Sequence, residues 1–407
     1  MGSENWRLTK WGDIAELKYG KALKGYKENT SGFPVFGTNG PIGYTEKPLA
    51  KGPGVIIGRK GAYRGVHYST KDFHVIDTAY YLIPKDENVD LRWAYYELLS
   101  KDLNSLDSGS AIPSTKKEDF YALKVRIPPL ASQKNIARIL SNFDEKISVN
   151  KKIIFNLEQL AQTFFKHWFV DFEFPNKEGK PYNSNGGKMT LIEDCIIPSG
   201  WSVDFMGNVT SKFATGLNPR KNFTLGEGSN YYVTIKNMGN NQIFLNEKCD
   251  KVTDEALLKI NKRSDLKKGD LLFSGIGTIG RVYLLNEDAS NWNISESIFT
   301  LRPNQKITSI YLYLILLSDD LQNYAIQLAS GSVQKGIRMA DLKKYKIILP
   351  PLEIIHSFTE MISPLISQIK ALEKQNHQLI LIRDYLLPRL LSGEIELFDQ
   401  SEVNEHV

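Results

Sequence analysis

The chain has 407 residues, which suits two or three domains, and its composition of 42% hydrophobic and 11% aromatic residues is typical of globular proteins and excludes wholesale disorder. The net charge of +5 permits a nucleic-acid partner without requiring one, because such binding depends on a local basic patch. No stretch approaches about 18 apolar residues and no signal-like segment opens the chain, so we expect a cytoplasmic protein without membrane spans.

Residues 1–130 are expected to form a first domain of short strands and a few helices. In its middle, the glycine-rich stretch 58–66 follows the apolar run 55–57 and precedes another apolar run. This order predicts a strand, a tight turn and a second strand. The domain ends at residues 109–130, which read GSAIPSTKKEDFYALKVRIPPL.

Residues 131–174 are expected to form one long helix. Apolar residues recur at 3-4 spacing from Ile136 to Trp168, interrupted by Asn150. Spacing sustained over this length is typical of a coiled coil. Residues 175–200 then form a linker or ordered loop, because they are polar and rich in residues that break helices and strands.

Residues 201–350 repeat the first domain. Their last part and the two residues that follow, 331–352, read GSVQKGIRMADLKKYKIILPPL and align with residues 109–130 without a gap, at an offset of 222. The stretch 274–282 likewise corresponds to 58–66. Residues 351–395 are expected to form a second long helix that breaks near Pro388, and residues 396–407 a disordered tail.

Each predicted helix carries an asparagine within its apolar stripe. If the helices pair antiparallel with their ends aligned, Asn150 and Asn376 face each other. A buried layer of this kind fixes the register of a helix pair at some cost in stability. The alternative is that each asparagine is a tolerated polar residue at the edge of the stripe.

The sequence contains no complete catalytic or cofactor-binding motif. Residues 275–280 match the glycine pattern of dinucleotide-binding proteins, but strand-like residues follow where that pattern needs a helix. The six histidines form no ligand cluster, and Cys195 and Cys249 are expected to be reduced thiols. We therefore expect no metal, no bound cofactor and no catalysis by this chain itself.

Basic residues beside glycines and aromatic residues recur at comparable places in both copies. Lysine, arginine and asparagine are the residues that contact DNA phosphates and base edges, although any one of them alone can be solvated surface charge. The candidate DNA-binding residues are Lys21, Lys24, Arg59, Lys60, Tyr63, Arg64, Lys116, Lys117, Arg220, Lys221, Lys236, Asn237, Arg281, Lys335 and Arg338.

The chain resembles the specificity subunit of Type I restriction-modification systems over residues 5–395. The resemblance rests on the two Pro-Pro-Leu junctions, on residues 165–172 (FKHWFVDF) and on residues 386–395 (LLPRLLSGEI). It implies an α/β (α+β) fold with a pseudo-twofold internal repeat. Two target recognition domains of mixed, mainly short-stranded sheet plus helices would be separated by two long antiparallel coiled-coil helices.

The resemblance also implies a role. Such a subunit directs two modification subunits and the restriction subunits to double-stranded DNA, and each recognition domain recognises half of a bipartite, asymmetric site. The helices would set the spacer and dock the modification subunits, and the isolated chain could form a homodimer. S-adenosylmethionine, ATP and Mg²⁺ would belong to the partner subunits. The alternatives are a non-enzymatic coiled-coil scaffold and a stand-alone DNA methyltransferase or nuclease.

Overall fold

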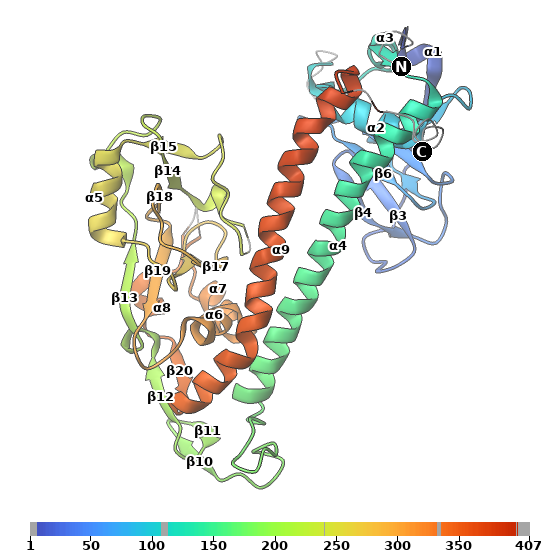
Figure 1. Cartoon of the computed structure of the whole chain (residues 1–407). Coiled ribbons are helices and arrows are strands. Elements are labelled where there is room, and N and C mark those ends of the chain that lie inside the picture. Colours follow the sequence, from blue (N-terminus) through green and yellow to red (C-terminus); the bar gives the residue numbers. More distant parts are fainter. Residues whose placement is uncertain (1–5, 107–112, 240, 332–334, 396, 398–407) are drawn as a thin grey trace, which may run out of the picture. The chain divides into compact units, whose positions relative to one another are not determined.

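The computed structural model describes residues 6–106, 113–239, 241–331, 335–395 and 397. The start of the strongest repeat match and the predicted tail, apart from Leu397, therefore lie outside the described residues. The chain divides into two compact units. Unit 1 comprises Met1–Asn150 and Gln375–Val407, and unit 2 comprises Lys151–Lys374. Two long helices, α4 (Leu130–Phe169) and α9 (Leu352–Ser392), each contribute one part to either unit (Figure 1).

Unit 1 contains two small sheets and a separate strand pair. The antiparallel sheet has the order β2-β8-β5-β6, and the mixed sheet has the order β4-β3-β7, in which β3 and β7 run parallel. Its strands are β1 (Arg7–Lys10), β2 (Ala15–Tyr19), β3 (Phe33–Gly37), β4 (Gly40–Thr45), β5 (Gly54–Gly58), β6 (Val66–Ser69), β7 (His74–Val75), β8 (Ala79–Pro84) and β9 (Lys124–Ile127). Its short helices are α1 (Trp11–Ile14), α2 (Leu91–Leu99), η2 (Leu103–Ser105) and α3 (Lys117–Ala122).

Unit 2 repeats these two sheets and the strand pair, and adds the hairpin of β10 and β11. Its antiparallel sheet has the order β13-β19-β16-β17, and in its mixed sheet, β15-β14-β18, the strands β14 and β18 run parallel. The strands are β10 (Met189–Ile192), β11 (Cys195–Pro198), β12 (Ser202–Phe205), β13 (Thr210–Thr215), β14 (Asn230–Val233), β15 (Asp250–Val252), β16 (Leu271–Ser274), β17 (Val282–Leu284), β18 (Trp292–Ile294), β19 (Ile298–Pro303) and β20 (Lys346–Leu349). The helices are η3 (Met206–Asn208), η4 (Pro219–Lys221), η5 (Ile235–Asn237), α5 (Asp254–Ser264), α6 (Ser309–Leu317), α7 (Asp319–Gln327) and α8 (Met339–Leu342).

The shared topology confirms the repeat and the mixed fold that the sequence predicts. In both units the first strand of the mixed domain pairs with its last strand, β1 with β9 and β12 with β20. The pairing places the Pro-Pro-Leu segments directly before the long helices. Each mixed domain is therefore closed by its own N- and C-terminal strands, and the chain then enters a helix.

The two long helices run antiparallel. In unit 1, Leu390 near the end of α9 packs in one apolar cluster with Ile136 and Leu140 near the start of α4. In unit 2, Phe358 near the start of α9 contacts Phe165 and Trp168 near the end of α4. Start therefore meets end in both units, as the resemblance to Type I specificity subunits implies.

The prediction of a helix break near Pro388 is wrong, because α9 continues to Ser392. A proline removes one backbone hydrogen bond from a helix. Leu390 is only 2% exposed within the unit 1 core, so burial of this apolar face offsets the missing bond. Pro364 likewise lies inside the helix.

The two asparagines of the apolar stripes meet. Asn150 Nδ2 donates to Asn376 Oδ1 at 2.9 Å and to Gln375 Oε1 at 2.7 Å. Asn150 is fully buried and Asn376 is 7% exposed. Asn150 Oδ1 is buried without a hydrogen-bond partner among the described residues. The layer is thus polar but incompletely satisfied, and its role in fixing the register stays a prediction.

Residues 175–200, expected as a linker or ordered loop, belong to unit 2 and contain the hairpin of β10 and β11. Tyr182 stacks on Phe174 with a ring-centroid distance of 4.6 Å, and Phe174 lies 4.9 Å from Trp201. The segment is therefore attached to the unit 2 core by aromatic contacts. The predicted domain limits fall at helix ends, whereas the compact units divide both helices near their middle.

Candidate nucleic-acid interface

The two glycine-rich stretches are turns built on one hydrogen-bond pattern. Gly58 N donates to Gly65 O at 2.8 Å, and Ser274 N donates to Arg281 O at 2.9 Å. Each turn joins two antiparallel strands, β5 to β6 and β16 to β17. This confirms the correspondence of 58–66 with 274–282 and the strand–turn–strand prediction. A strand, not a helix, follows residues 275–280. The helix that a dinucleotide-binding motif needs after its glycines is therefore absent there.

Each turn is hydrogen-bonded to the loop that precedes the last short helix of its domain, α3 in unit 1 and α8 in unit 2. In unit 1, Gly61 N donates to Pro113 O at 2.9 Å and Thr115 N donates to Arg59 O at 3.0 Å. In unit 2, Gly277 N donates to Lys335 O at 2.8 Å and Ile337 N donates to Gly275 O at 2.9 Å. Glycine suits both turns, because Gly61 and Gly277 have φ of +117° and +82°.

In unit 1 these hydrogen bonds bring together candidate residues that lie far apart in the sequence. Arg59 and Lys60 on the turn lie beside Lys116 and Lys117, which begin helix α3. Lys60, Tyr63 and Lys116 are exposed. Backbone hydrogen bonds thus gather residues more than 50 positions apart into one basic surface.

Tyr19, which the sequence analysis missed, is the centre of that surface. Its ring centroid lies 5.0 Å from Arg59 Cζ and 4.3 Å from Lys117 Nζ. Tyr80 on the neighbouring strand lies 5.0 Å from the Tyr19 ring. Burial and the neighbouring Tyr19 raise the pKa of Tyr80 to about 12, so its hydroxyl stays protonated and donates to Thr115 O. The only signal in the sequence was an aromatic residue ending a strand next to Gly20.

Lys21 and Lys24 are exposed on the segment that follows Tyr19. Lys21 N donates to Val75 O at 2.8 Å, which fixes the main chain at this point. Both side chains are therefore available to solvent on the same segment as Tyr19.

The structure revises the prediction for Arg64. Arg64 is 2% exposed, and its guanidinium donates to the main-chain oxygens of Gly61, Leu103, Asn104 and Leu106. A buried guanidinium bonded to carbonyls holds the turn against η2 and offers no free edge to a ligand. We therefore assign Arg64 a structural role.

The structure revises the prediction for Asn237 in the same way. Asn237 is 5% exposed and accepts hydrogen bonds from Thr234 N and Thr234 Oγ1, which closes the η5 turn. Its neighbour Lys236 remains exposed.

The other unit 2 candidates occupy three places. Arg220 and Lys221 are exposed on η4, which Asn218 caps. Lys335 and Arg338 are exposed before α8, where Arg338 pairs with Asp341 at 2.7 Å. Arg281 is half-buried and donates to the main-chain oxygens of Ile235 and Met238. Its guanidinium thus links the glycine-rich turn to η5.

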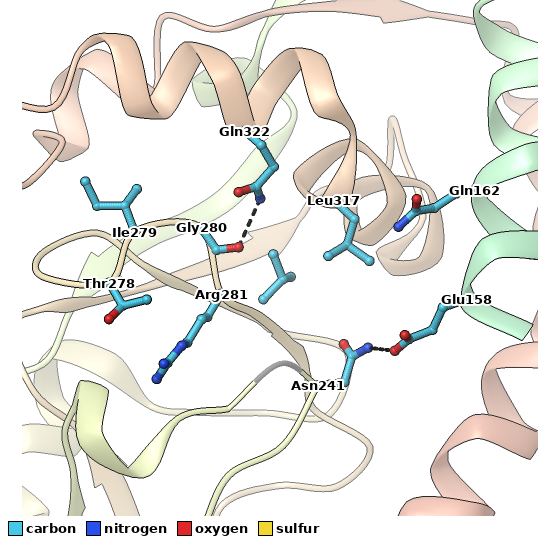
Figure 2. Close-up of a pocket in the computed structure, with 10 residues that line it drawn as sticks. Glu158, Gln162, Asn241, Thr278, Ile279, Gly280, Arg281, Leu317 and Gln322 are labelled. Carbon is cyan, nitrogen blue, oxygen red and sulfur yellow. Dashed lines mark hydrogen bonds between the residues drawn. The ribbon is translucent and has the colours of Figure 1, made fainter. Parts of the chain in front are cut away.

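A cavity of about 460 Å³ lies in unit 2 between this turn and helix α4 (Figure 2). Figure 2 shows Thr278 and Arg281 on the turn side and Glu158 and Gln162 on the helix side. Gln322 on α7 donates to Gly280 O at 3.0 Å and closes the top of the cavity as drawn. The cavity is lined by polar groups, several of which bond to each other, and by the apolar side chains of Ile279, Val282 and Leu317.

Asn241 joins the cavity wall to both long helices within unit 2. Its Nδ2 donates to Glu158 on α4, its Oδ1 accepts from Tyr313 Oη, and its main-chain oxygen accepts from Lys370 Nζ on α9 at 3.0 Å. Burial raises the pKa of Glu158, although the bond from Asn241 opposes this. Asn241 is 4% exposed and has a φ of +54°, so it serves as a fixed positioning residue.

The described residues offer neither a metal-binding cluster nor a membrane-spanning helix. They contain no group of three or more histidine, cysteine, aspartate or glutamate side chains placed to hold a metal ion. No helix among them is long and apolar enough to cross a membrane.

Comparison with known proteins places the chain in a family. Its residues 3–159 and 198–381 match the family model described as Type I restriction modification DNA specificity domain. It is 28% identical to the Type I restriction enzyme MjaIX specificity subunit of Methanocaldococcus jannaschii, over 78% of this chain and 71% of that protein. It is 23% identical to the HindI specificity subunit of Haemophilus influenzae, over 80% of this chain and 82% of that protein.

A solved structure shares the fold. The crystal structure of the Type I restriction-modification system S subunit from M. genitalium matches 95% of this chain and 96% of that chain, with a TM-score of 0.59 at 17% identity. The family model covers both mixed domains and much of both long helices. The chain therefore belongs to the family of Type I restriction-modification DNA specificity subunits, which are not themselves catalytic.

Proposed function

We propose that each mixed domain recognises one half of a bipartite, asymmetric site in double-stranded DNA. The observation that carries this proposal is one backbone frame used twice with different side chains. The hydrogen bonds of the turns make Arg59 correspond to Gly275 and Lys116 to Arg338. An unchanged frame with changed side chains supports two different half-sites, because base edges are recognised by side chains whereas the frame only positions them.

The candidate contacts in the first domain are Lys21, Lys24, Arg59, Lys60, Tyr63, Lys116 and Lys117. Those in the second are Arg220, Lys221, Lys236, Arg281, Lys335 and Arg338. Lysine and arginine at such positions bind phosphates and make affinity depend on salt. Arg64 and Asn237 act from behind this surface by holding the turns.

We further propose that the chain works with two modification subunits and with restriction subunits in the cytoplasm. S-adenosylmethionine, ATP and Mg²⁺ would be held by those partners. Support comes from apolar residues left exposed on the long helices. Leu381, Ile382 and Tyr385 on α9 are 56%, 46% and 59% exposed and lie within one turn of the helix. This surface would dock a modification subunit or, in the isolated chain, a second copy.

The test is methylation by the complex reconstituted with its modification subunits. We expect Arg59→Glu with Lys117→Glu to abolish methylation of the native target. The control is Lys177→Glu with Lys180→Glu, which changes the net charge equally on an exposed loop. A coiled-coil scaffold would keep methylation in both variants, and methylation by the purified chain alone would instead indicate a stand-alone enzyme.

The spacer proposal has its own test. The helices α4 and α9 have 40 and 41 residues. Deleting seven residues from each shortens them by about 10 Å, or about 3 base pairs of B-DNA. We expect mapped methylation sites to keep both half-sites and to lose about that many unread base pairs. An unchanged spacer would contradict the role of the helices in spacing.

A further inference from the structure

The basic surface of unit 1 contains an arrangement that ordinary surface charge does not produce. Tyr19 is 51% exposed, and two cations, Arg59 and Lys117, lie over its ring. The same two cations lie 5.8 Å and 5.9 Å from the ring of Tyr80. Two positive side chains therefore share one pair of tyrosines, whose rings contact each other at an angle of 60°, at the edge of the sheet.

No carboxylate neutralises this pair among the described residues. Neither Arg59 nor Lys117 forms an ion pair there. Glu16, the carboxylate that responds to the charge of Lys117, is itself paired with Lys18 at 2.6 Å. Like charges held together without a counter-charge disfavour each other in the free protein, and an anionic ligand relieves this cost.

Arg59 is held at both ends. Its backbone N donates to Thr78 O at 2.9 Å, and its Nη1 donates to Asp77 O at 3.0 Å. The face of the guanidinium rests on Tyr19, a contact that strengthens when water is excluded. Among the described residues, one of the five guanidinium N–H groups of Arg59 donates a hydrogen bond, so an edge remains for a ligand with two acceptors.

Tyr19 is itself fixed in place. A Cβ at the following residue, Gly20, would lie 2.0 Å from Ile76 O, so only glycine lets the strand approach this closely. Tyr19 also pairs with Tyr80 across β2 and β8. The platform under Arg59 is thus rigid before any ligand arrives.

We propose that Arg59, positioned by Tyr19 and the Asp77 carbonyl, recognises one guanine in one half of the DNA target, while Lys117 binds a nearby phosphate. This rests on the proposed function and names a base within it. A fixed guanidinium edge matches the O6 and N7 acceptors of guanine in the major groove, and arginine is the residue that makes this contact most often.

The second domain lacks this device at the matching places. Hydrogen-bond correspondence puts Gly275 where Arg59 lies, and the helix starts align Met339 with Lys117. Thr215 occupies the end of the strand where Tyr19 ends β2. The guanine contact therefore belongs to one half-site only, and the other half-site is an internal control for folding and assembly.

The test compares variants in the complex reconstituted with its modification subunits, on a DNA library in which every position of the native target is varied. Arg59→Lys keeps the charge but removes the two-pronged edge. We expect the preference for guanine at one position of one half-site to fall about 5- to 150-fold, with the other half-site unchanged. Tyr19→Leu should weaken the same preference, whereas Tyr19→Phe should keep it because the ring remains.

Lys117→Ala should lower the affinity for all DNA sequences alike. It should also reduce the slope of log affinity against log salt concentration by about 1. The inference is overturned if Arg59→Lys alters no base preference, if it weakens every sequence equally, or if the altered position is not a guanine in the native target. These results leave the bipartite target intact. By contrast, a native complex with no bipartite target would refute the proposed function itself.

Discussion

The two units attach the same kind of mixed domain to the same pair of helices by different chemistry. In unit 1 the joint includes a polar cluster. Tyr96 Oη donates to Asp144 on α4 at 2.5 Å, and Arg383 on α9 donates to the same carboxylate at 2.7 Å. Gln133 on α4 also donates to Asn88 O and Pro128 O.

In unit 2 the corresponding joint is dominated by aromatic side chains. Phe169 on α4 lies 4.7 Å from Phe358 on α9 and 4.8 Å from Tyr311 of the mixed domain. The polar connections of this joint include Asn241 with its partners Glu158 and Lys370, and a hydrogen bond of 2.7 Å between the hydroxyls of Thr308 and Thr359 on α9. Repetition thus conserves the topology of the frame while the chemistry of its joints diverges, and variants of the two joints should behave differently.

Truncating the aromatic joint should have the largest effect. Phe358 is fully buried among Phe165, Trp168 and Phe169. Phe358→Ala leaves a cavity and should lower the free energy of unfolding by about 3–5 kcal/mol. Urea unfolding measures the loss, and hydrogen exchange should place the new opening in unit 2. Leu381→Ala, at an exposed position, is the matched control and should change little.

Weakening the polar joint should cost less. Tyr96→Phe removes a hydrogen bond to a carboxylate that keeps Arg383 as a partner, so we expect a loss of about 1.5–3 kcal/mol. Hydrogen exchange should now show faster opening in unit 1. If Tyr96→Phe destabilised the chain as much as Phe358→Ala, the distinction between a polar and an aromatic joint would be unsupported.

Replacing the asparagine layer should change stability in the opposite direction. Asn150→Leu with Asn376→Leu removes a buried oxygen that has no partner, which costs about 1–3 kcal/mol when present. We expect a higher melting temperature together with less specific pairing of the helices, visible as a broader distribution of cross-links along α4 and α9. Unchanged stability would argue against a buried layer that trades stability for register.

The smallest effect concerns the pH dependence of the Asn241 cluster. Burial raises the pKa of Glu158 above its ordinary value of 4.5. The native state therefore binds the proton more tightly than the unfolded state, and stability should rise as the pH falls through the native pKa toward 4.5. Glu158→Gln should flatten this slope. Glu373, whose pKa burial also raises, retains its own contribution in both proteins. Equal slopes of stability against pH in the two proteins would show that Glu158 does not contribute to this pH dependence.

Part of the basic surface of unit 1 could be predicted from residue types, and part could not. Arg59, Lys60, Lys116 and Lys117 were candidates because basic residues stand beside glycines in corresponding stretches. Tyr19 could not be singled out, because an aromatic residue at a strand end is common and its meaning depends on cations that arrive from distant segments. Arg64 was selected for the same reason as Arg59, yet it points inward.

What the sequence determined by itself was periodic or repeated. The offset of 222 residues, the 3-4 stripe of the helices and the strand–turn–strand order all reflect local geometry that neighbouring residues dictate. These features gave the two copies and the two long helices, and they left the contact of Asn150 with Asn376 as one of two alternatives.

Only the tertiary structure decided which polar groups face outward. It also decided how far the helix α9 continues. The backbone hydrogen bonds from Thr115 N to Arg59 O and from Gly61 N to Pro113 O bring the turn and α3 together, and no local pattern encodes them. Burial of Leu390 carries α9 past Pro388, against the local rule. A proline inside a helix costs about 3 kcal/mol, and burying one leucine side chain contributes about 1.5–3 kcal/mol, so packing against distant residues can override the local preference.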